Sequence, residues 1–177
     1  MANRDAQIAS PIRLIISDVD GVLTDGRITI DNAGIESKSF FVRDGLGIKL
    51  WQRCGFTFAL LTARNSQVVK IRAGELGVNV VRQGFSDKLP AAREIFEELN
   101  VAPAEVCYIG DDLPDLPVMY EVGLPVTVAD GAPEVQSAAT WTMNAAGGRG
   151  AVRELVQRLL VAKGRWEDCV PSRHPVE

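Results

Sequence analysis

The sequence predicts an α/β fold in which a doubly wound, mainly parallel sheet is covered by helices on both faces. Short apolar runs rich in β-branched residues alternate with helical segments, which is typical of parallel sheets. A length of 177 residues is enough for one domain with a real core and short for two. We therefore expect one domain at 12–163, preceded by a flexible arm at 1–11 and followed by a tail at 164–177.

The first strand is expected at 13–17, where an apolar run leads into a glycine turn. A small β-hairpin insert is expected at about 25–42, because the turn sequence 31–34 lies between two short runs. No large cap domain is expected. Amphipathic spacing predicts the helices at 89–99 and 150–162. In chain order the remaining elements are helix 45–53, strand 57–62, helix 66–76, strand 79–82, strand 105–109, a short helix from 114, strand 125–128, a short helix near 133–137 and strand 140–143.

Composition excludes several classes of function. The net charge of −4 provides no general basic field for nucleic acid. Three scattered cysteines, Cys54, Cys107 and Cys169, argue against a disulfide framework and suit a reducing cytosol. The single histidine, His174, makes a His-based zinc site improbable. With no secretion signal and no membrane-spanning run, we expect a cytoplasmic protein without membrane or nucleic-acid partners.

Polar side chains follow four of the expected strands. In a doubly wound sheet, strand ends on the same edge converge on one crevice. Carboxylates grouped without His or Cys favour a hard cation such as Mg²⁺, whereas hydroxyl, ammonium and guanidinium groups suit phosphate oxygens. Metal and phosphate together indicate phosphoryl transfer. The side chains concerned are Asp18, Asp20, Thr62, Arg64, Lys88, Asp111, Asp112 and Asp115.

Each of these signals has an ordinary structural alternative. The D-x-D-G sequence could be a calcium loop, but Val22 stands where an EF-hand needs a third oxygen ligand. Thr62 alone could cap a helix, and Lys88 alone could be a solvated surface residue. Asp112 and Asp115 could simply favour a helix N-terminus. The joint occurrence of these signals at successive strand ends favours a site.

These motifs, D-V-D-G-V-L-T from Asp18, Thr62, Lys88 and G-D-D-L-P-D, resemble the haloacid dehalogenase superfamily of phosphatases over residues 12 to about 163. The segments F-V-R-D-G-L-G-I-K from Phe41 and A-G-G-R-G-A-V-R-E from Ala146 resemble the branch that hydrolyses 3-deoxy-D-manno-octulosonate 8-phosphate. That resemblance implies a Mg²⁺-dependent phosphomonoesterase of lipopolysaccharide sugar synthesis. Phosphatases of related nine-carbon ulosonic acid phosphates stay open as an alternative.

The resemblance also implies roles for the motif residues. Asp18 would be the nucleophile and Asp20 the general acid and base. Mg²⁺ would be held by Asp18, the main-chain carbonyl of Asp20 and Asp111. Thr62 and Lys88 would hold the transferring phosphoryl group. Asp112 would support the groups that surround the metal, and Asp115 is a weaker candidate for the same role. The implied substrate-binding residues are Asp20, Arg43, Asp44, Gly45, Lys49, Arg64, Arg72 and Lys88.

A site without a cap would admit water freely. The resemblance implies that a homotetramer closes it, and the apolar hairpin residues Ile28, Ile30, Phe40 and Phe41 could supply contact surface. Two positions depart from the usual family pattern. Ala63 stands where glycine is usual in T-G-R, and Phe41 stands where a polar residue often precedes V-R-D-G. The role of the 164–177 tail is not indicated.

Two rival classes share part of this pattern. A phospho-accepting receiver also combines aspartates, Thr and Lys with Mg²⁺ on a doubly wound sheet, but its motifs follow a different order along the chain. A non-catalytic sugar-phosphate-binding module could use the same fold. Phosphate release would distinguish an enzyme from such a module.

Overall fold

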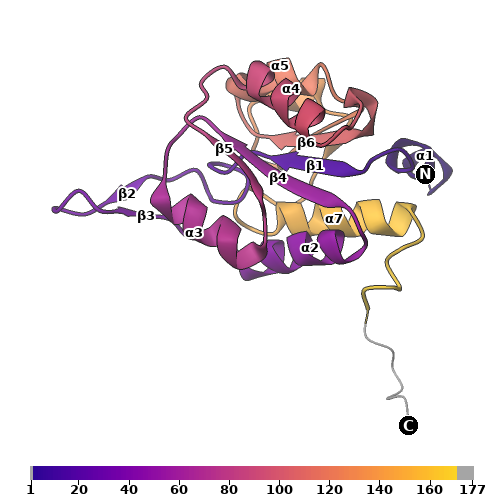
Figure 1. Ribbon diagram of the computed structural model, residues 1–177, viewed down its shortest axis with the longest axis horizontal. Helices are drawn as coiled ribbons and strands as arrows, with labels where there is room; N and C mark the ends of the chain where they lie inside the picture. Colours follow the sequence, from indigo (N-terminus) through magenta and orange to yellow (C-terminus); the bar gives the residue numbers. More distant parts are fainter. Residues whose placement is uncertain (1, 171–177) are drawn as a thin grey trace, which may run out of the picture.

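The central sheet has six parallel strands in the order β5-β4-β1-β6-β7-β8, in a computed structural model that describes residues 2–170 (Figure 1). β1, the strand that precedes the first aspartates, lies between β4 and β6, with Ser17 paired to Leu60 and to Ile109. The predicted doubly wound fold is confirmed. The strands are β1 (Leu14–Ser17), β4 (Thr57–Thr62), β5 (Val80–Gln83), β6 (Val106–Gly110), β7 (Leu124–Thr127) and β8 (Trp141–Thr142).

Helices cover both faces of the sheet and enclose two apolar layers. On one face, α2 (Val42–Arg53), α3 (Gln67–Leu76) and α7 (Ala151–Ala162) bury side chains against β1 and β7. On the other face lie α4 (Lys88–Glu98), α5 (Leu116–Met119) and α6 (Pro133–Ala138). Figure 1 shows α4 and α5 on one side of the strands and α2 and α7 on the other. Both faces of β1 are therefore dry, which explains its continuous apolar run.

The N-terminal segment corrects one prediction. The expected flexible arm is instead helix α1 (Ala2–Ala9), which packs against α7. Asp5 accepts hydrogen bonds from Nε and Nη2 of Arg158 at 2.9 and 3.1 Å, and Ala9 is fully buried. This segment is short and polar on average, so its order depends on packing against α7, whose Arg158 lies 153 residues beyond Asp5 in the chain.

The residues after α7 are also partly packed. Arg153 lies over the ring of Trp166 at 4.7 Å, and Sγ of Cys169 lies 3.2 Å from Sγ of Cys54. The beginning of the predicted tail therefore contacts α2 and α7. Residues 171–177, which include His174, lie outside the described residues. A single 3₁₀ turn before β6, η1 (Pro103–Glu105), was also not expected.

The predicted hairpin insert is present but short, with β2 (Thr29–Ile30) pairing antiparallel to β3 (Glu36–Ser37). Asp31 organises its turn by accepting hydrogen bonds from the N–H groups of Ala33 and Ile35 at 2.9 and 2.8 Å. Figure 1 shows the hairpin projecting from the body of the domain. Along the described chain, no helix has the length and apolarity needed to cross a membrane.

Candidate active site

The site begins where β1 ends. Asp18 donates its main-chain N–H to the carbonyl of Ile109 at 3.0 Å, and its Oδ1 accepts the N–H of Val19 at 2.7 Å. These bonds hold a buried carboxylate at the centre of the sheet edge. Neighbouring strands end at the same edge, so β4 delivers Thr62 and β6 delivers the acidic run that starts at Asp111.

Lys88 is a buried ammonium between two carboxylates. Its Nζ lies 3.0 Å from Oδ2 of Asp18 and 2.6 Å from Oδ1 of Asp115, and its side chain is 2% exposed. Burial alone would lower its pKa, but the two carboxylates outweigh burial and raise it, so Lys88 stays charged. The ordinary surface-lysine alternative is thus excluded, and a fixed positive charge lies beside Asp18.

Asp115 organises the loop after β6. Its Oδ1 accepts from Lys88 and from the hydroxyl of Tyr108 at 2.6 Å, while its Oδ2 accepts the N–H groups of Asp111 and Asp112 at 2.9 and 3.2 Å. All four partners are donors, and the Asp115 side chain is 1% exposed. Asp115 is consequently committed to holding Asp111 and Lys88 in place.

The carboxylates in this cluster suit a metal ion. Asp18, Asp111 and Asp115 each offer an oxygen within 4.8 Å of the others. Burial raises the pKa of Asp18 to about 6, and burial together with the charge of Asp18 raises the pKa of Asp111 to about 8. A bound cation would lower the pKa of both carboxyl groups, because it favours their ionised forms. Since Asp115 already accepts four hydrogen bonds, Asp18 and Asp111 are the side chains available to a hard cation.

Gly21 allows this approach. A Cβ at Gly21 would lie 2.0 Å from Oδ2 of Asp111, and its φ of +92° is a conformation that other residues rarely adopt. Glycine at this position therefore opens the space into which Asp111 projects.

Asp112, by contrast, is exposed, and its side chain accepts the N–H of Leu113 at 2.8 Å as the N-cap of the 3₁₀ turn η2 (Leu113–Asp115). It is placed to support the loop more directly than the metal shell.

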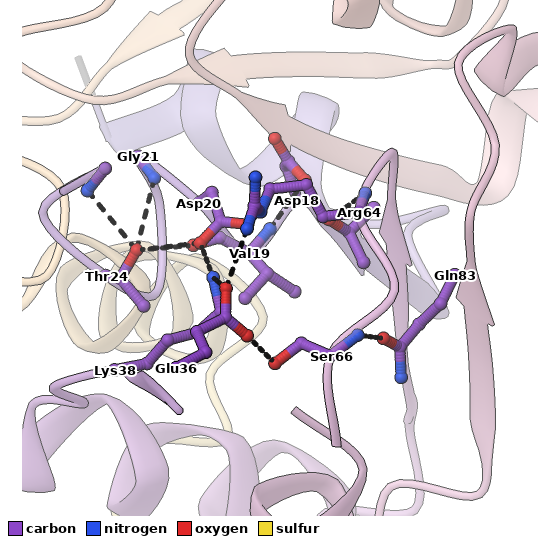
Figure 2. A network of polar contacts seen from close by, with 12 residues as sticks. Asp18, Val19, Asp20, Gly21, Thr24, Glu36, Lys38, Arg64, Ser66 and Gln83 are labelled. Carbon is purple, nitrogen blue, oxygen red and sulfur yellow. Dashed lines mark hydrogen bonds and ion pairs between the residues drawn. The ribbon is translucent and has the colours of Figure 1, made fainter. Parts of the chain in front are cut away.

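Asp20 lies in a second polar network, which joins the hairpin to the sheet edge (Figure 2). Lys38 donates a hydrogen bond to Oδ1 of Asp20, and Nε of Arg64 lies 3.8 Å from Oδ2 of Asp20. Glu36 accepts hydrogen bonds from Nη2 of Arg64 at 2.8 Å and from the hydroxyl of Ser66 at 2.5 Å. These hydrogen bonds lower the pKa of Glu36 to about 2, so it remains charged at neutral pH.

Sequence reasoning did not identify the hairpin members of this network. Glu36 lies in β3 and Lys38 follows directly after it, so their alternate spacing along extended chain is the local signal they carry. Gln83, whose Oε1 accepts the N–H of Ser66 at 2.6 Å, is equally unremarkable in sequence. Only the fold shows that the hairpin reaches Asp20.

The other predicted substrate residues lie in different environments. Asp44 is buried and accepts the N–H groups of Gly150 and Arg153 at 3.2 and 2.7 Å, so it caps the N-terminus of α7, and its contact with a substrate stays a prediction. Arg72 pairs with Glu75 at 3.0 Å and packs against Gly45, where a Cβ would clash with it. The remaining two, Arg43 and Lys49, are exposed on α2.

A separate groove of about 780 Å³ runs along α7. Arg43, Arg149 and Arg153 line it, together with Phe41, and none of its lining residues belongs to the aspartate cluster.

Ala63, which stands where glycine is usual in the family, fits without strain, because it is exposed and does not adopt a positive φ. The turn after β4 thus tolerates a side chain at the usual glycine position.

Comparison with known proteins places these features in a family. A family model described as haloacid dehalogenase-like hydrolase matches residues 52–155. The 3-deoxy-D-manno-octulosonate 8-phosphate phosphatase of Escherichia coli (strain K12) is 46% identical over 161 residues, which cover 91% of this chain and 86% of that protein.

Solved structures agree. The 3-deoxy-D-manno-octulosonate 8-phosphate phosphatase of Yersinia pestis has a TM-score of 0.90 at 45% identity, covering 92% of this chain and 88% of that one. The Moraxella catarrhalis phosphatase, in complex with a magnesium ion, a phosphate ion and a KDO molecule, has a TM-score of 0.91 at 37% identity, covering 94% and 95%. The receiver alternative is therefore excluded, and the chain belongs to the haloacid dehalogenase-like hydrolases.

Proposed function

We propose that this protein is a Mg²⁺-dependent phosphomonoesterase that hydrolyses 3-deoxy-D-manno-octulosonate 8-phosphate to the free sugar acid and phosphate. The observation that carries this proposal is the ion pair between Asp18 and Lys88 beside the carboxylate of Asp111, at one sheet edge. The substrate follows from relatives of that activity that match more than nine-tenths of the chain.

In the proposed reaction, an oxygen of Asp18 attacks phosphorus, and the bond from phosphorus to the sugar oxygen breaks. Asp20 gives a proton to the departing sugar oxygen. Asp20 then takes a proton from water as that water attacks the phosphorus of the aspartyl-phosphate, which frees Asp18 and releases phosphate. Lys88 stays charged throughout and offsets the negative charge that develops on the phosphoryl oxygens.

Asp18, Asp111 and the main-chain carbonyl of Asp20 would hold Mg²⁺. When bound, the ion supplies charge neutralisation to the phosphoryl oxygens. Thr62, buried at the end of β4, is proposed as a hydroxyl contact to the same group. Arg64 is a candidate for the sugar acid, because its side chain is 42% exposed at the rim of the Asp20 network.

We further propose that the protein is cytoplasmic, serves lipopolysaccharide sugar synthesis and assembles as a homotetramer. The hairpin supports assembly, since Ile28, Ile30 and Ile35 are all exposed on it. Phe40, in contrast, packs against the core of its own chain. The molecular mass in solution, measured by light scattering, tests the tetramer.

The proposed function is tested by measuring phosphate release from 3-deoxy-D-manno-octulosonate 8-phosphate, with Mg²⁺ and with a chelator, beside a panel of other sugar phosphates. Mg²⁺-dependent release confined to that substrate is expected. Release only from a nine-carbon ulosonic acid phosphate would move the substrate and keep the chemistry. A folded protein that binds these sugars without releasing phosphate from any would be a binding module.

Asp18→Asn provides the mechanistic control, because it removes the nucleophile and a metal ligand while preserving volume. We expect this variant to keep its fold, measured by circular dichroism, and to lose phosphate release. Retention of most activity would overturn the role of Asp18.

A further inference from the structure

The two oxygens of Asp20 are not equivalent. Oδ1 accepts from Lys38 and lies 3.5 Å from the hydroxyl of Thr24. Oδ2 is buried and, among the residues that the structure describes, has no hydrogen-bond partner. A buried carboxylate oxygen without a partner is costly unless another group uses it. The network therefore holds Oδ1 by hydrogen bonds and leaves Oδ2 without one, with Nε of Arg64 3.8 Å away, so Oδ2 is the oxygen placed to exchange a proton.

Lys38 is built into this arrangement. Its side chain is only 1% exposed although it comes from a projecting hairpin, and its Nζ lies 3.5 Å from Oε1 of Glu36 as well as beside Asp20. A buried ammonium is expensive unless it is paired, and Lys38 has two carboxylate partners.

Arg64 completes a balanced set of charges. It lies between the same two carboxylates, 3.8 Å from Asp20 and 2.8 Å from Glu36. The four groups alternate in sign, as Figure 2 shows, so each cation faces two anions. Glu36 is the anchor, because Ser66 also binds it from the loop after β4. Glu36 thereby fixes the hairpin to the sheet edge. Lys38, which pairs with both Glu36 and Asp20, restrains the Asp20 side chain in turn.

We propose that Lys38 is a positioning residue for Asp20, holding Oδ1 so that Oδ2 is the oxygen that passes protons to the leaving group and from water. This inference rests on the proposed phosphatase activity. It assigns to the hairpin a function in each subunit, besides any contact with neighbouring subunits. The step it affects is proton transfer, and the attack by Asp18 is not altered.

The test compares leaving groups. Departure of p-nitrophenolate needs little protonation, whereas an alkoxide needs a proton from Asp20. The value of kcat/KM reports the steps up to leaving-group departure, so it is measured for p-nitrophenyl phosphate, for ethyl phosphate and for the proposed sugar phosphate. General acid catalysis typically contributes about 10²–10⁴-fold. We expect Lys38→Met to lower kcat/KM about 10- to 100-fold for both alkyl phosphates and by under about 3-fold for the aryl phosphate.

A matched control lies on the same hairpin. Arg27→Met removes the same charge from an exposed side chain whose nearest carboxylate, Asp25, is 4.0 Å away. This variant should match the wild type on all three substrates. Lys38→Arg keeps the charge and should recover part of the loss, and it also serves if the methionine variant does not fold.

The Asp20→Asn background isolates the mechanism by a double-mutant cycle. If Lys38 acts through Asp20, Lys38→Met will lower kcat/KM for ethyl phosphate no further in that background. An equal loss on aryl and alkyl substrates, a loss confined to the sugar phosphate, or an undiminished effect beside Asp20→Asn would each overturn the proposal. A wild-type protein that releases phosphate from no substrate would instead refute the proposed function itself.

Discussion

The hydrogen bonds of Asp115 lead us to expect that the variant Asp115→Asn has a lower free energy of unfolding than the wild type. All four groups around this carboxylate donate, two of them to each oxygen. An amide has one accepting oxygen, so its NH₂ group must face either Lys88 and Tyr108 or the two backbone N–H groups. In both orientations donors face donors, and the charge opposite Lys88 is lost.

The cost follows from burial. Removing one partner of a buried ion pair typically costs about 3–5 kcal/mol. Lys88 keeps its second carboxylate, Asp18, at 3.0 Å, which places the expected loss near the lower end of that range. We therefore expect Asp115→Asn to lower the free energy of unfolding by about 3 kcal/mol, before any effect on catalysis.

Chemical denaturation measures this loss, and Asp112→Asn is the matched control. Asp112 is exposed and caps η2, a position where Asn serves as well as Asp, so its variant should lie within about 0.5 kcal/mol of wild type. Both proteins are measured with a chelator present. A loss below about 1 kcal/mol for Asp115→Asn, similar to that of Asp112→Asn, would refute the view that Asp115 is the buried support of this loop.

The remaining predictions concern the metal cluster. Asp18 and Asp111 have pKa values raised from 3.8 to about 6 and about 8, so the metal-free folded state binds more protons than the unfolded state between about pH 4 and pH 8. Its free energy of unfolding should therefore fall as pH rises through that window, and the gain in melting temperature from Mg²⁺ should grow from about pH 5 to about pH 8; a Mg²⁺ effect independent of pH would contradict this. Gly21→Ala should weaken Mg²⁺ binding and abolish phosphate release, because the added Cβ occupies the space of Asp111. Calorimetric titration that finds unchanged Mg²⁺ affinity in this variant would contradict the close approach.

The sequence carried enough information for the sheet and for the first aspartates. Strand β1 is buried on both faces, so its run of apolar residues is unambiguous, and a doubly wound sheet necessarily brings the end of β1 beside those of β4 and β6. For Lys88, local sequence could not distinguish a solvated residue from a buried one. Its burial depends on Asp115, 27 residues further along the chain.

Long-range packing explains what was missed. Helix α1 is stabilised by Arg158 and by the surface of α7, which its own residues do not predict. Local sequence also did not reveal that the Asp44 carboxylate accepts an N–H group at the start of α7, 106 residues away. Glu36 and Lys38 acquire meaning only when the hairpin folds back onto Asp20, through contacts whose partners lie on other elements.

If Asp18 is the nucleophile, it becomes phosphorylated during turnover, and that covalent species can be trapped. Asp20→Asn should slow hydrolysis of the aspartyl-phosphate, so the variant is mixed with p-nitrophenyl phosphate and Mg²⁺, quenched in acid and digested for peptide mass spectrometry. We expect a phosphoryl group on the peptide that contains Asp18, and none when Asp18→Asn is added. Catalytic turnover by the wild type, with an unmodified Asp18 peptide in every quenched sample, would show that Asp18 is not the nucleophile.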